Sequence, residues 1–185
     1  KQGSCEYCRF PFVRTEGHGG AGVMAPENSL EGFQLAIDIG LDSIECDVWL
    51  SKDNVVLVHH APPGGMVNFT TGKFNMTEID SDDLEHLTLP NGDKIITLEE
   101  LLDLTKDKIS VNIEIEDTRD KIVGYIVDLV IKKDMLGQVF ISSFYHYMRK
   151  TLTEEVAKRS IKTPISFGFI TMLPDLVFPD YGRET

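Results

Sequence analysis

Four carboxylates stand at alternating positions in two otherwise apolar segments: Glu45 and Asp47 in the first, Glu114 and Glu116 in the second. Alternation is typical of a β-strand, and it predicts that each segment has one apolar face and one acidic face. A buried carboxylate without a partner is costly or loses its charge, and too few basic residues lie nearby to pair all four. A single Glu of this kind is better explained by a solvent-exposed strand end. For Glu45, Asp47 and Glu114 together, a divalent cation with oxygen ligands is the better explanation.

Three histidines accompany these acids and could transfer protons. His18 lies in the glycine-rich segment 17–22, and His59 with His60 ends a predicted strand over residues 54–60. Because neighbouring strand residues point to opposite faces, only one of this pair is expected to share a site with the acids. A lone histidine at a strand end more often packs than reacts. Two histidines beside an acid cluster favour a general acid and a general base, since imidazole titrates near neutral pH.

The elements that must position these residues alternate between strand and helix. Helices are predicted to begin near residues 28, 97, 120 and 147, and the first two have capping-box spacing, Asn28 with Glu31 and Thr97 with Glu100. Residues 61–92 are expected to be irregular apart from a short helix near 80–87. The pattern predicts an α/β fold with a parallel sheet whose chemistry lies at the C-terminal ends of the strands. Strands are predicted over residues 10–15, 43–50, 54–60, 110–116, 138–144 and 164–170.

The chain is strongly acidic, with 30 Asp and Glu against 18 Lys and Arg and a formal net charge of −12. This charge argues against nucleic acid or an anionic membrane as a partner held by bulk electrostatics. An anionic ligand would need a cation in its site. No stretch approaches the roughly 20 consecutive apolar residues of a transmembrane helix.

Cysteines and glycosylation motifs say little about the compartment. Cys5 and Cys8 form a single CxxC pair without the second ligand pair of a zinc site, which leaves a disulfide or two free thiols. Cys46 has no obvious partner. The triplets that begin at Asn68 and Asn75 are N-glycosylation sequons, and they favour a secretory or membrane-associated compartment only slightly.

Eight short motifs, in order between residue 18 and about residue 169, resemble those of the glycerophosphodiester phosphodiesterase family. Residues 45–48 read Glu-Cys-Asp-Val and resemble the family's Glu-x-Asp-Val, and residues 26–29 read Pro-Glu-Asn-Ser and resemble its Pro-Glu-Asn-Thr. Each motif is weak by itself, whereas the ordered set is specific. The eight motifs are residues 17–20, 26–29, 45–48, 58–60, 70–72, 96–100, 112–116 and 141–144.

The resemblance implies a fold, a metal and a reaction. The fold is a (β/α)8 barrel of the TIM type. Glu45, Asp47 and Glu114 would bind Ca²⁺ or Mg²⁺, with His18 and His59 as the acid–base pair. A phosphodiester neutralised by the metal would be hydrolysed to glycerol phosphate and a free alcohol, after attack by water or by the neighbouring glycerol hydroxyl. Sphingomyelinases D and phosphoinositide-specific phospholipases C are similar in outline, so lysophospholipids stay open as substrates beside small phosphodiesters.

Five further motif positions are expected near the substrate: Gly19, Glu27, Asn28, His60 and Glu116. Three depart from the family pattern, because Gly19 replaces Arg, His60 replaces Asp and Glu116 replaces Lys. Losing both cations removes charge-assisted hydrogen bonds worth about 1.5–3 kcal/mol each. Two hypotheses stay open. One is an active hydrolase whose Glu116 and His60 hold a second cation, and the other is a catalytically degenerate relative that serves as a binding or structural subunit.

Residues 1–185 are expected to form a single glycerophosphodiester phosphodiesterase-like domain. About six of the eight β/α units of a barrel can be identified, which is fewer than closure requires. The last two units would be missing, or supplied by a partner chain at the open edges of the sheet.

Overall fold

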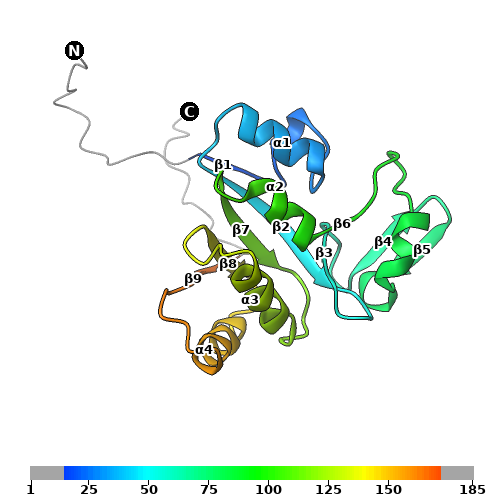
Figure 1. Cartoon of the computed structure of the whole chain (residues 1–185). Helices are drawn as coiled ribbons and strands as arrows, with labels where there is room; N and C mark the ends of the chain where they lie inside the picture. The colour runs from blue at the N-terminus through cyan, green and yellow to red at the C-terminus, as the bar shows by residue number, and fades with distance from the viewer. Residues whose placement is uncertain (1–14, 172–185) are drawn as a thin grey trace, which may run out of the picture.

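The computed structural model describes residues 15–171, which are built around one seven-stranded sheet (Figure 1). Its order is β6-β3-β2-β7-β8-β9, with β1 paired to the start of β2. The strands are β1 (Glu16–Gly17), β2 (Ser43–Leu50), β3 (Val56–Val58), β6 (Ile96–Thr97), β7 (Ser110–Ile115), β8 (Val139–Ser143) and β9 (Ser166–Phe169). The α-helices of this part of the chain are α1 (Leu30–Asp38), α2 (Leu98–Thr105), α3 (Ile122–Lys132) and α4 (Met148–Lys158).

Five strands form the parallel part of the sheet, namely β1, β2, β7, β8 and β9. Helices connect them as in a (β/α)8 barrel, which confirms the predicted fold class. The predicted third strand exists as β3, but it runs antiparallel to β2, so the expectation of six parallel units was wrong. The physical reason is length: residues 51–55 link the two strands, whereas a parallel crossover needs a dozen residues or more.

One face of the sheet is apolar and packs beneath the helices. Ile44 and Val48 of β2 and Ile113 of β7 are fully buried in a core shared with α2 and α3. Helix α1 packs beside α2, and α3 beside α4 (Figure 1). Burying one such side chain stabilises the fold by about 1.5–3 kcal/mol. The helices therefore fix β2 and β7 from one side, and the predicted acidic face lies on the other.

A small unit is inserted between β3 and β6, beyond the C-terminal end of β2 (Figure 1). It contains the hairpin of β4 (Met66–Phe69) and β5 (Gly72–Asn75) and the 3-10 helices η2 (Met76–Glu78) and η3 (Ser81–His86). The helix predicted near 80–87 is η3, but the expectation of an otherwise irregular segment was wrong because it missed the hairpin. The unit has its own core, which includes Trp49 of β2.

The glycine-rich loop after β1 is held tightly against α1. Gly20 has φ +107°, and a Cβ there would lie 2.8 Å from the Gly32 carbonyl carbon, so the loop can approach the helix only with glycine. The helix cap differs from the prediction, because Ser29 and not Asn28 caps α1 and accepts from the Gly32 N–H at 3.0 Å. The capping box of Thr97 and Glu100 on α2 is confirmed.

Several smaller predictions have clear outcomes. Cys5, Cys8 and most of the strand predicted over 10–15 lie outside the described residues. Cys46 is buried with a free thiol, and burial raises its pKa. At the second glycosylation sequon, the Asn75 amide is engaged in a hydrogen bond, because it donates to the Gly64 carbonyl at 2.7 Å. Within residues 15–171, the helices are too short or too polar to cross a membrane.

Candidate active site

Three carboxylates converge on the polar face of the sheet. In the parallel register of β2 and β7, Asp47 pairs with Glu114, and Glu45 lies one pleat earlier on the same face of β2. One ligand oxygen from each of Glu45, Asp47 and Glu114 lies within 4.8 Å of the others. The convergence predicted from the alternating sequence is therefore present.

Of the three acids, Glu45 has the carboxyl group whose ionised form is most disfavoured. Its side chain is 5% exposed; Oε2 accepts from the Gly19 N–H at 2.9 Å, while Oε1 is buried without a hydrogen-bond partner among the described residues. Burial, and then the charge of Asp47, raises its pKa to about 8. An unpaired buried oxygen of this kind fits a group that binds from outside the polypeptide, since buried polar atoms are almost always paired.

Asp47 is oriented by Asn28. The Asn28 amide donates to Asp47 Oδ2 at 2.9 Å, and its carbonyl oxygen accepts from the Asp47 backbone N–H at 3.1 Å. Asn28 holds φ +55°, a left-handed conformation that asparagine tolerates better than most residues. Burial raises the pKa of Asp47 even with this hydrogen bond. Asn28 therefore does not take the predicted capping role and instead fixes the Asp47 carboxylate.

Glu114 completes the cluster from β7. It is half-buried, and burial followed by the charge of Asp47 raises its pKa to about 7. Within residues 15–171, no lysine or arginine forms an ion pair with any of the three acids. Hard oxygen ligands, an orphaned carboxylate oxygen and the absence of a local counter-charge fit a divalent cation such as Mg²⁺ or Ca²⁺.

The three histidines differ in how they are placed relative to the acid cluster. His18, exposed in the loop after β1, and His60 are close enough to Asp47 for positive charge on either to lower its pKa. The His59 backbone N–H donates to the Asp47 carbonyl at 3.0 Å. Its ring is half-buried, and burial, with a smaller effect of His60, lowers its pKa to about 4. His18 and His60 therefore act on Asp47 from the segments after β1 and β3, whereas the contact of His59 with Asp47 is through its backbone.

Glu116 has partners of its own. Its Oε2 accepts from the Trp49 indole N–H at 2.8 Å and from the Ala61 N–H at 3.0 Å, and Oε1 lies 3.3 Å from His60 Nε2. Burial raises its pKa. At the position where the resemblance predicts lysine, this chain therefore has a carboxyl group held by N–H donors.

Gly19 and Glu27 pack against each other at the edge of the cluster. Gly19 has φ +56°, and a Cβ there would lie 3.0 Å from Glu27 Cβ, so reintroducing arginine would strain this loop. Glu27 is exposed, and its charge raises the pKa of Asp47. The substrate-contact roles of Gly19, Glu27, Asn28, His60 and Glu116 stay predictions.

Sequence reasoning missed a set of hydrogen bonds on the same face of the sheet. The Asn112 amide donates to Glu16 Oε1 at 3.3 Å, and Ser142 Oγ donates to the Asn112 carbonyl oxygen at 2.7 Å. These bonds tie β1, β7 and β8 together beside the acids, since Asn112 pairs in register with Glu45 and Ser142 with Glu114. Asn112 could have been found, because it alternates with Glu114 inside a motif already recognised.

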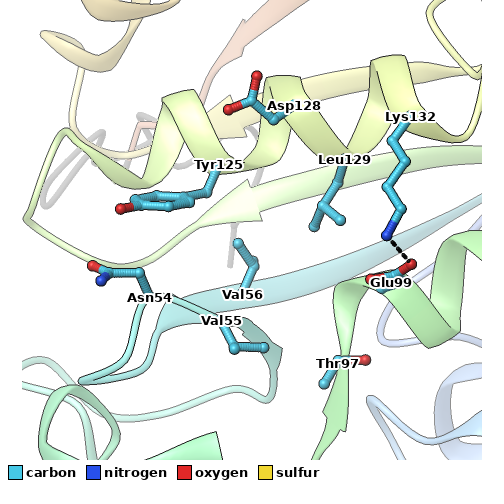
Figure 2. Close-up of a pocket in the computed structure, with 9 residues that line it drawn as sticks. All are labelled: Asn54, Val55, Val56, Thr97, Glu99, Tyr125, Asp128, Leu129 and Lys132. Carbon is cyan, nitrogen blue, oxygen red and sulfur yellow. Dashed lines mark hydrogen bonds and ion pairs between the residues drawn. The ribbon is translucent and has the colours of Figure 1, made fainter.

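Two cavities have different relations to this site. One of ≈ 380 Å³ adjoins His59 and His60 beneath the inserted unit. The other, of ≈ 270 Å³, lies between α3 and residues 54–56 and 97–99, and the Lys132–Glu99 ion pair of 2.7 Å borders it (Figure 2). None of the predicted site residues lines this second cavity, so it is separate from the acid cluster.

Comparisons with known proteins agree with this geometry. The model of the Glycerophosphoryl diester phosphodiesterase family matches residues 18–160. A glycerophosphodiester phosphodiesterase of Caldanaerobacter subterraneus is 31% identical over 144 residues, which cover 70% of this chain and 57% of that protein. The chain thus spans little more than half of the length of this relative.

Solved structures show the same fold. A protein from Galdieria sulphuraria has a TM-score of 0.74 at 24% identity, over 86% of this chain and 65% of that one. A glycerophosphodiester phosphodiesterase from Agrobacterium tumefaciens has a TM-score of 0.67 at 25% identity, over 80% of this chain and 64% of that one. With its motifs, its sheet and the family match over residues 18–160, this chain belongs to the glycerophosphoryl diester phosphodiesterase family.

Proposed function

We propose that this protein hydrolyses glycerophosphodiesters to glycerol phosphate and an alcohol, with Mg²⁺ or Ca²⁺ bound by Glu45, Asp47 and Glu114. The observation that carries the proposal is the convergence of these acids within 4.8 Å, with Glu45 Oε1 left without a partner. The named activity of the relative from Caldanaerobacter supports the choice of substrate. A lysophospholipid is a larger member of the same substrate class.

The chain's own residues would share the work as follows. The three carboxylates hold the cation, which would neutralise the phosphodiester and orient it. Asn28 and the Gly19 N–H fix Asp47 and Glu45, so that the ligand oxygens do not reorganise when substrate arrives. Of His18 and His59, one would take the proton from the attacking hydroxyl and the other would protonate the leaving alcohol.

The direct test is release of glycerol phosphate from glycerophosphocholine by protein stripped with EDTA and then supplied with Mg²⁺ or Ca²⁺. We expect turnover only with a divalent cation, and loss of turnover in His18→Ala with metal affinity retained. Equal rates for wild type and His18→Ala would contradict the acid–base assignment. Equal rates with and without metal would contradict the role of the acids.

A catalytically degenerate binding subunit is the second candidate function. The observation that favours it is Glu116, whose carboxylate stands where the family has lysine and whose charge raises the pKa of Glu114. The same assay separates the two hypotheses. Metal binding by Glu45, Asp47 and Glu114 without any release of glycerol phosphate would favour the degenerate subunit.

A further inference from the structure

The cavity of ≈ 380 Å³ beside His59 and His60 is formed by the inserted unit, and its volume is in the range of small-molecule sites. Met66, Val67 and Leu89 supply apolar wall, together with two prolines. The amides of Asn68 and Asn91 add neutral polar groups. His60 lines this cavity, and its ring also lies 3.3 Å from Glu116 and close enough to Asp47 to lower its pKa. A substrate held at the acids would therefore extend into the cavity.

The residues that line the cavity limit the class of ligand that it can bind. Among residues 15–171, the charged or titratable side chains that line the cavity are the two histidines, so the cavity does not suit a phosphate or a carboxylate. The described lining also has no tryptophan, tyrosine or phenylalanine face of the kind that recognises a quaternary ammonium group. An uncharged hydrocarbon segment fits this wall, because its burial is favourable and leaves no polar group unpaired.

Backbone hydrogen bonds hold the two walls in place. The Thr70 N–H donates to the Thr88 carbonyl at 2.8 Å and joins the hairpin to the segment that carries Leu89. The Met76 N–H donates to the Gly65 carbonyl, also at 2.8 Å, and closes the base of the hairpin. The wall residue Val67 is 4% exposed and belongs to the core of the inserted unit. The cavity is therefore part of the folded unit and does not depend on a ligand.

We propose that this cavity binds an alkyl chain on the alcohol that lies on the His59 side of the phosphate. The inference rests on the proposed function and specifies its substrate class as phosphodiesters in which one alcohol carries an uncharged hydrocarbon chain. Specificity then comes from Met66, Val67 and Leu89, and phosphate chemistry stays with the acids and histidines.

The test uses glycerophospho-n-alkanols with alcohols of two to ten carbons. We expect kcat/KM to rise about two- to fourfold for each added methylene until the cavity is full, given the free energy of burying a methylene. Met66→Asp should make kcat/KM nearly independent of chain length. The isosteric Met66→Gln should reduce the slope of log(kcat/KM) against carbon number by about half.

Phe74→Asp is the matched control. Phe74 is 40% exposed against 37% for Met66 and lies on the partner strand of the same hairpin, but it does not line the cavity. The control should keep the wild-type chain-length dependence. A flat wild-type series, or equal flattening by Met66→Asp and Phe74→Asp, would overturn the proposal.

A binding measurement separates this inference from the proposed function. Calorimetric titration with 1-octanol should show binding to wild type and Phe74→Asp, and at least about tenfold weaker binding to Met66→Asp. If octanol binds in this way while no member of the series is hydrolysed, the alkyl site stands and the proposed hydrolysis fails. If the short esters are hydrolysed but octanol binds all three proteins equally or not at all, the alkyl site fails alone.

Discussion

A single buried acid, Asp117, and the cluster of Glu45, Asp47 and Glu114 lie on or just after the neighbouring strands β2 and β7, and within residues 15–171 only Asp117 has a cationic side chain as its partner. Asp117, 1% exposed just after β7, accepts from Arg119 Nε at 3.0 Å and from the Leu50 N–H at 3.0 Å. Arg119 also donates to the Leu50 carbonyl, which ties the end of β2 to the turn after β7. This buried carboxylate, which has a structural role, is therefore neutralised by an ion pair with arginine.

Glu45, Asp47 and Glu114 lie earlier on the same two strands and have no such partner among the described residues. The chain can therefore neutralise a buried acid with a local arginine, and it does not do so at the cluster. The difference supports the proposal that the cluster binds a cation from outside the polypeptide. The Asp117–Arg119 pair shows that this fold can neutralise a buried carboxylate with arginine. The metal proposal is therefore better supported than it would be by the acids alone.

The largest expected effect comes from exchanging the two aspartates for asparagine. Asp47→Asn should lower kcat/KM for glycerophosphocholine by about 10³-fold, or about 4 kcal/mol, because it removes a ligand charge. The free energy of unfolding of the metal-free protein should stay equal or rise, since repulsion with Glu45 and Glu114 falls. Asp117→Asn is the control and should do the reverse, with metal affinity kept and stability lost. Urea unfolding without metal measures both stabilities. Similar losses in the two variants would contradict the distinction between Asp47 as a metal ligand and Asp117 as a structural acid.

Removing the cation of the structural pair comes next. Arg119→Met leaves Asp117 charged and buried, and should lower the free energy of unfolding by about 3–5 kcal/mol. Urea unfolding measures this, with Lys52→Met as control, because the Lys52–Asp80 pair is exposed and should contribute nothing measurable. A loss in Arg119→Met no larger than in Lys52→Met would show that Asp117 needs no counter-charge.

The acid cluster should make the metal-free protein less stable as pH rises. The folded-state pKa values of Glu45, about 8, and Glu114, about 7, lie above the ordinary value of 4.5. The protonated forms are therefore favoured by folding, and the stability present below about pH 4.5 is lost as pH rises through 7 and 8. We expect a loss on the order of 2–4 kcal/mol between pH 5 and pH 8.5 in EDTA.

Thermal unfolding in EDTA across this range measures the effect, and Glu45→Gln should remove most of it. Saturating Mg²⁺ should raise Tm more at pH 8.5 than at pH 5, because the cation competes with protons for the same oxygens. A metal-free Tm that is constant or rises from pH 5 to pH 8.5 would contradict the buried, uncompensated character of the cluster.

The smallest expected effect is at Asn28. Asn28→Asp preserves a residue that tolerates φ +55°, but replaces the amide donor to Asp47 with a carboxylate. Affinity for Mg²⁺ or Ca²⁺ should fall about 10–100-fold, as is typical when a group that orients a ligand is lost. Calorimetric titration gives the number, and Asn75→Asp, in the inserted unit, serves as a control for the chemical change. Unchanged metal affinity in Asn28→Asp would leave Asn28 with a local structural role alone.

Local features were predictable from sequence where local physics decides them. The alternation of residues 43–50 gave β2 with its observed bounds, and Thr97 with Glu100 gave the cap of α2. The direction of β3 could have been deduced, because residues 51–55 are too few for a crossover. The hairpin was harder, since β4 is short and its turn residues also suit an irregular loop.

Tertiary features were not predictable in the same way. Asn28 and Ser29 are equally good capping residues, and what decides between them is Asp47, nineteen residues away from Asn28 in sequence. The alternation put Glu45, Asp47 and Glu114 on polar faces, but their approach depends on the register between β2 and β7. The pairing of Asp117 with Arg119 was also missed, because a short acidic–basic sequence does not reveal burial.

The most direct test of a cation at the acid cluster is the anomalous difference map of a crystal soaked in Mn²⁺, an oxygen-seeking probe for a Mg²⁺ or Ca²⁺ site. A peak in coordination contact with Glu45 Oε1, Asp47 and Glu114, absent from Asp47→Asn crystals, is the predicted result. Saturating Mn²⁺ with no peak at these oxygens, or a peak that persists in Asp47→Asn, would contradict it.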